Sequence, residues 1–133
     1  MTILIVDDEP EVLRLMAATV GMAGYEVLLA DSGDEALAIC ESQACCIDLM
    51  ISDVAMPRMN GRALAECMND RHPDVPIVFV SGYPESPAIV AGLTARGFEN
   101  GYSYVPKPFR AQELLKVVKT VLRTAAKVRV SKA

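Results

Sequence analysis

The segment Ile3-Leu4-Ile5-Val6-Asp7-Asp8-Glu9-Pro10 decides the fold class of this 133-residue chain. Its first four residues are apolar and mostly β-branched, which is typical of a strand buried on both faces. Three acids follow, and Pro10 suits the first turn of a helix, whose positive end favours neighbouring acids. The segment therefore predicts a buried strand that leads directly into a helix.

The same alternation of short apolar runs and helical patterns continues along the chain. Further strands are predicted at Tyr25–Ala30, Leu49–Ile51, Val75–Val80 and Tyr102–Val105. Gly24 is a stop signal for the first helix, and Ser32 with Glu35 matches a capping box that opens the second. This pattern predicts an α/β fold of the (βα)5 type, doubly wound, with a five-stranded parallel sheet and helices on both faces. Prolines and glycines within residues 82–101 make the fourth helix short or irregular.

Composition restricts the function classes. The length predicts one domain, at residues 1–125, followed by a frayed basic tail at residues 126–133. A hydrophobic content of 52% excludes a disordered chain, and a net charge of −4 argues against direct nucleic-acid binding. The four cysteines form no CxxC pair, so they are expected to be reduced thiols and not zinc ligands. With neither a signal peptide nor a membrane span in evidence, the expectation is a cytoplasmic protein that makes no membrane contact.

Polar residues follow four of the predicted strands, and parallel strands bring their carboxyl ends to one edge of the sheet. These segments are Asp7-Asp8-Glu9, Ser52-Asp53, Ser81-Gly82 and Lys107-Pro108. Three carboxylates at one edge repel one another unless a cation lies among them, and oxygen ligands suit Mg²⁺. A divalent ion, a lysine and a hydroxyl together would bind phosphoryl oxygens, and an aspartate there can itself be the nucleophile.

Four segments at these strand ends give the chain a family resemblance. They are Ile5-Val6-Asp7-Asp8-Glu9, the run from Ser52 to Gly61 (SDVAMPRMNG), Val80-Ser81-Gly82, and Tyr104-Val105-Pro106-Lys107-Pro108-Phe109. Together, and in this order, they resemble the receiver domain of bacterial two-component response regulators over nearly all of residues 1–125. The resemblance implies the flavodoxin-like strand order 2-1-3-4-5, which places the acids after the first strand beside Asp53.

The resemblance also implies a role for each acid at this edge. Asp53 would be the phosphoacceptor and would take its phosphoryl group from a sensor histidine kinase or a histidine phosphotransfer protein. Asp8, Asp53 and the backbone carbonyl of Ala55 would ligate Mg²⁺, for which Mn²⁺ can substitute, and Asp7 would hold a metal-bound water. The protein would phosphorylate itself and slowly lose the group, without being a turnover enzyme.

The remaining roles fall on the last two strand ends. Lys107 would pair with the phosphoryl oxygens, Ser81 would hydrogen-bond one of them, and Tyr104 would be an aromatic switch. A cis peptide is implied between Lys107 and Pro108. The small Gly82 would leave the phosphoryl site open, and Tyr83 would shield it from water.

Several alternatives stay open. Asp7 and Asp8 would serve only as helix caps in a purely structural interpretation, and Tyr104 would be an ordinary strand residue. A Mg²⁺-dependent phosphohydrolase with an aspartate nucleophile is one functional alternative, although position 9 is Glu where such enzymes resemble Asp-x-Asp. A receiver that only binds partners, without phosphorylation, is another. The spacing from Ser81 to Lys107 exceeds that of common receivers, which puts the family's usual output surface in doubt. The segment Ser81-Gly82-Tyr83 resembles receivers that stand alone or belong to hybrid kinases.

Overall fold

Five parallel strands form one sheet in the order β2-β1-β3-β4-β5. The computed structural model describes residues 1–42, 47–53, 61–72, 74–81, 102–106 and 109–132. The strands are β1 (Thr2–Val6), β2 (Glu26–Ala30), β3 (Leu49–Asp53), β4 (Ile77–Ser81) and β5 (Tyr102–Pro106). The helices are α1 (Pro10–Met22), α2 (Gly33–Ser42), α3 (Gly61–Arg71) and α5 (Ala111–Lys132). The expected fold class and strand order are confirmed, whereas the expectation of an irregular fourth helix concerns residues outside the described ranges.

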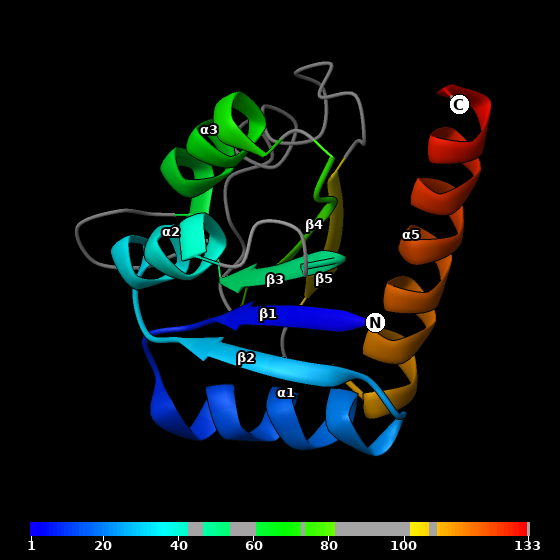
Figure 1. The fold of residues 1–133 in the computed structure, drawn as a ribbon. Coiled ribbons are helices and arrows are strands. Elements are labelled where there is room, and N and C mark those ends of the chain that lie inside the picture. Colours follow the sequence, from blue (N-terminus) through cyan, green and yellow to red (C-terminus); the bar gives the residue numbers. More distant parts are fainter. Residues whose placement is uncertain (43–46, 54–60, 73, 82–101, 107–108, 133) are drawn as a thin grey trace.

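The sheet separates two apolar clusters, and alternate residues of β1 supply both of them. Ile3 and Ile5 face α1 and α5, whereas Leu4 and Val6 face α2 and α3. Figure 1 shows this layering, with α1 beneath the sheet and α2 and α3 on the other side. All four apolar residues of β1 are fully buried, which confirms the prediction of a strand covered on both faces.

The helix ends agree with most of the predicted signals. Pro10 occupies the first turn of α1, and the chain leaves this helix through Gly24, whose φ of 97° favours a residue without a side chain. The backbone N–H of Glu35 donates to Oγ of Ser32 at 3.1 Å, which is one half of the predicted capping box. The carboxyl group of Glu35 interacts with Asp31.

The last helix is longer than the sequence pattern indicated. The apolar residues named in the sequence pattern end at Ala125, and α5 continues to Lys132, through residues that the sequence assigned to a basic tail. The physical reason is that no Gly or Pro interrupts residues 111–132, and Ala, Lys and Arg are strong helix formers. None of the helices in the described ranges is long and apolar enough to cross a bilayer.

Cys40 and Cys67 are free thiols, in agreement with the expectation of reduced cysteines. The side chain of Cys40 is buried between α2 and the sheet, and Cys67 on α3 is half-buried. Burial, with a smaller contribution from the nearby charge of Glu41, raises the pKa of the Cys40 thiol to about 11. Because the thiolate is the reactive form, Cys40 stays protonated and inert near neutral pH.

We expect the packing of α5 against the sheet to contribute strongly to stability. Leu114 is fully buried, whereas Leu15 on α1 is 58% exposed. Leu114→Ala should lower the free energy of unfolding by about 2–5 kcal/mol, because it removes apolar contacts and leaves a cavity. Leu15→Ala, the matched control, should change it by less than about 0.5 kcal/mol. Urea denaturation followed by circular dichroism measures both values, and equal losses would contradict this account of α5.

Candidate functional site

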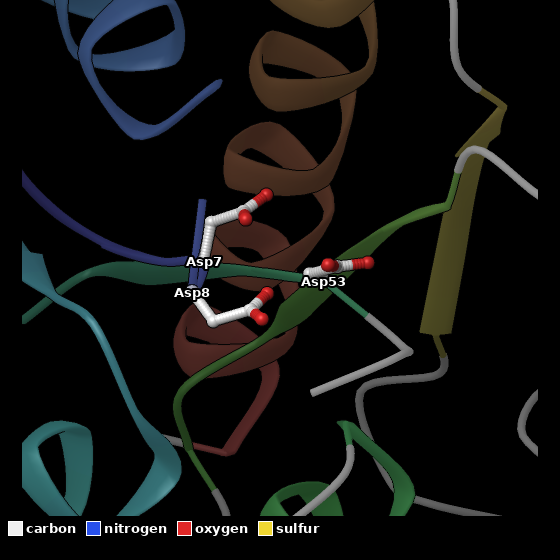
Figure 2. A group of neighbouring side chains, drawn as sticks. All are labelled: Asp7, Asp8 and Asp53. Atoms are coloured by element: carbon white, nitrogen blue, oxygen red, sulfur yellow. The ribbon is translucent and has the colours of Figure 1, made fainter. Parts of the chain in front are cut away.

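Three aspartates meet at the carboxyl edge of the sheet. Asp7 and Asp8 directly follow β1, and Asp53 is the last residue of β3, which pairs with β1 in parallel. One carboxylate oxygen from each of the three lies within 4.8 Å of the others. Figure 2 shows the three neighbouring side chains, Asp7 and Asp8 at the end of β1 and Asp53 at the end of β3. The structure therefore brings together the three acids that the sequence placed at one edge.

The three acids differ in their surroundings. Asp7 is fully buried, Asp53 is 4% exposed, and Asp8 is open to solvent. Oδ1 of Asp7 accepts a hydrogen bond from the backbone N–H of Glu9 at 2.8 Å. Glu9 is the residue that precedes α1, so this bond forms a turn ahead of the helix and fixes the Asp7 side chain. Two acids are thus held within the protein, while the third faces the water from which an ion would enter.

The cluster brings three carboxylates of like charge close together. Two unit charges 4.8 Å apart repel by about 3 kcal/mol at an effective dielectric constant of about 20. Asp31 and Glu35 add two further acids where β2 leads into α2. A hydrogen bond with Asp31 raises the pKa of the Glu35 carboxyl. A set of carboxylate oxygens at this spacing is the donor chemistry that Mg²⁺ accepts. The residues present therefore fit a hard divalent cation.

The other predicted site residues are described only in part. Ser81 ends β4 one position beyond Val80, which is the register partner of Asp53, so its backbone lies at the same edge. Tyr104 lies in β5 opposite Phe79. The predicted roles of Ala55, Gly82, Tyr83 and the Lys107–Pro108 peptide fall outside the residues that the structure describes.

The sequence pattern gave no role to Ser52, which the structure places next to Asp53 on β3. Its side chain is 1% exposed, and its Oγ donates to the backbone carbonyl of Asp53 at 3.0 Å. The available signal was a polar residue inside a strand that otherwise reads as buried. The pattern could not indicate which acceptor the hydroxyl would find.

A doubly wound parallel sheet with acids at its carboxyl edge defines a class of α/β domains that bind ligands at that edge. Comparison with known proteins identifies the family within this class to which the chain belongs. The family model of the response regulator receiver domain matches residues 3–119, and the chain belongs to this family. The family is one of signalling domains in two-component systems, which confirms the expectation from the sequence.

Relatives within the family are found among both kinases and regulators. The chain is 38% identical over 121 residues to the sensor kinase CckA of Brucella abortus, covering 91% of this chain and 12% of that protein. It is 35% identical over 124 residues to the nitrogen assimilation regulatory protein NtrX of Azorhizobium caulinodans, covering 92% and 26% respectively. The chain thus spans only a minor part of these two relatives.

Solved structures agree with the fold. The crystal structure of the receiver domain from the hybrid histidine kinase CckA is 36% identical, with a TM-score of 0.75, and the match covers 92% of this chain and 99% of that one. NtrX from Brucella abortus gives a TM-score of 0.88 at 31% identity, with 98% of this chain and 29% of that one covered. Both similarities extend over nearly all of the chain.

Proposed function

We propose that this receiver domain accepts a phosphoryl group on the Asp53 carboxylate from a phospho-histidine. The donor would be a sensor histidine kinase or a histidine phosphotransfer protein. One observation carries the proposal: Asp53 ends a central strand with its carboxylate within 4.8 Å of those of Asp7 and Asp8. Carboxylates this close repel one another, two of the three are buried, and a cation bound among them would offset the repulsion.

The proposed reaction needs one nucleophile from this chain. A carboxylate oxygen of Asp53 forms a bond to the phosphorus atom while the bond between phosphorus and the imidazole nitrogen of the donor breaks. The electron pair of the broken bond stays on the imidazole, and Asp53 becomes an acyl phosphate. No proton has to leave Asp53, because the carboxylate is already the nucleophilic form.

The surrounding acids would hold the cation. Asp8 and Asp53 would be direct ligands of Mg²⁺ or Mn²⁺, with the backbone carbonyl of Ala55, and Asp7 would bind through water. When bound, the ion would neutralise charge on the acids and on the incoming phosphoryl oxygens. The turn between Asp7 and Glu9 supports this assignment, because it fixes the Asp7 carboxylate before any ion arrives.

The remaining roles are proposed from the family resemblance. Lys107, which follows β5 in the sequence, would pair with phosphoryl oxygens, and Ser81 would donate a hydrogen bond to one of them. Tyr104 would be the aromatic switch, whose side chain turns inward when Ser81 binds the phosphoryl group. Gly82 and Tyr83 would control access, and a cis bond before Pro108 would set the direction of Lys107.

Incubation with a small acyl phosphate and Mg²⁺ tests the proposal. We expect intact-mass measurement to find one phosphoryl group per chain, because the small donor replaces the phospho-histidine without any partner contact. Omission of Mg²⁺ should prevent the reaction. Steady turnover of an added phosphate ester would favour the phosphohydrolase, and an unmodified chain would favour a receiver that only binds partners.

A further inference from the structure

Ser52 is a polar residue in an apolar position. It follows Met50 by two residues on β3, so it faces the same cluster, on the side of α2 and α3. Its register partners on the neighbouring strands are Val6 and Phe79, both buried. Among the residues that the structure describes, the buried polar side chains are those of Asp7, Ser52 and Asp53. Two of these belong to the acid cluster, and Ser52 adjoins it.

Burying a hydroxyl in these apolar surroundings costs free energy that an Ala or Val side chain would not. Burial of a hydroxyl without a hydrogen bond is unfavourable, so its acceptor determines what the residue does. Oγ of Ser52 donates to the backbone carbonyl of Asp53 at 3.0 Å and is shielded from solvent. The partner of this buried hydroxyl is therefore the main chain of the proposed phosphoacceptor.

The position of this bond along the strand gives it a consequence. Asp53 is the last residue of β3, and Asp53–Val80 is the last register pair between β3 and β4. Rotation about the Cα–C bond of Asp53 changes the direction of its carbonyl. A hydrogen bond to that carbonyl restricts the rotation.

We infer that Ser52 is a positioning residue for the proposed site: its hydroxyl holds the main-chain carbonyl of Asp53, the residue that carries the proposed phosphoacceptor carboxylate. This inference rests on the proposed function of Asp53. The hydroxyl itself touches neither metal nor phosphoryl group. It acts on the main chain of the residue whose carboxylate lies with those of Asp7 and Asp8.

Three substitutions separate the hydroxyl from the volume of the side chain. Ser52→Ala removes the donor, Ser52→Cys keeps nearly the same shape with a weak donor, and Ser52→Thr keeps the hydroxyl. We expect Mg²⁺ affinity, measured by calorimetry, to fall about tenfold in the Ala and Cys variants, as for other residues that support metal ligands. The rate of phosphorylation by acyl phosphate should fall with it. Ser52→Thr should retain both within about twofold.

A readout without metal checks the mechanism directly. In the metal-free protein, the carbonyl ¹³C resonance of Asp53 should shift in the Ala and Cys variants and stay near its original position in the Thr variant. Ser42→Ala is the matched control, because Ser42 is exposed and its Oγ donates to the carbonyl of Ile39 on α2, away from the site. It should change none of these quantities.

The outcomes distinguish this inference from the proposed function. A wild-type protein that neither binds Mg²⁺ nor is phosphorylated overturns both. A normal wild type with unchanged Ala and Cys variants overturns the role of Ser52 alone. Equal losses in all three variants, Thr included, also overturn it, because packing and not the hydroxyl would then be responsible. Circular dichroism verifies that each variant is folded, and the Cys variant remains informative if Ala leaves a cavity.

Discussion

Asp53→Asn should abolish the phosphoryl adduct that the wild-type protein forms with acyl phosphate and Mg²⁺. The amide has nearly the shape of the carboxylate but carries no nucleophilic oxyanion, so the attacking atom is lost while the 4% exposed site keeps its packing. We expect the loss to be complete within the detection limit of intact-mass measurement. Circular dichroism should show an unchanged secondary structure.

Asp34→Asn is the matched control for this result. Asp34 lies in the first turn of α2 and is exposed, so the substitution removes the same charge at the start of a helix near the same sheet edge. It should leave the yield of adduct unchanged. An adduct of undiminished yield in Asp53→Asn would contradict the assignment, and peptide mapping would then locate the true acceptor.

Mg²⁺ should stabilise the folded protein, and Asp8→Asn should remove most of this effect. An ion that binds only the native state raises the free energy of unfolding by about 2.7 kcal/mol at one hundred times its dissociation constant. For a domain of this size, each kcal/mol corresponds to roughly 2–8 °C in Tm. Thermal melts with Mg²⁺ and with EDTA, at matched ionic strength, measure the difference.

The same experiment tests the repulsion within the acid cluster. Without divalent ions, Asp53→Asn should melt at a higher temperature than the wild type, because it removes a charge beside the buried Asp7. With Mg²⁺ the order should reverse or the gap should close. Asp34→Asn should keep the full Mg²⁺ shift. A shift of equal size in Asp53→Asn and wild type would contradict a cation site among the three aspartates.

The sequence predicted the sheet well because burial on both faces leaves a simple pattern. Residues Ile3 to Val6 are all apolar, and the acids that follow them mark the end of the strand. The meeting of Asp7, Asp8 and Asp53 followed from the parallel arrangement of strands and the strand order that the family resemblance implied. The structure confirms both the arrangement and the order.

Other features depend on information that the pattern does not contain. The acceptor of the Ser52 hydroxyl depends on one side-chain rotation within a packed cluster. The hydrogen bond between Glu35 and Asp31 depends on the side-chain conformations of both residues at the start of α2. The continuation of α5 from Ala125 to Lys132 reflects backbone propensity, which periodicity alone does not measure. The roles of Ala55 and Lys107 stay predictions.

The position of the aspartates at the carboxyl ends of β1 and β3 also affects how local unfolding of the sheet would disturb the site. β2 and β5 are the edge strands, whereas β1 and β3 have a hydrogen-bonded neighbour on each side. Amide hydrogens of such central strands exchange with solvent through the openings of highest free energy. Fluctuations that detach an edge strand therefore leave the backbone supports of Asp7, Asp8 and Asp53 in place. The acidic cluster is anchored in the part of the sheet that should exchange most slowly.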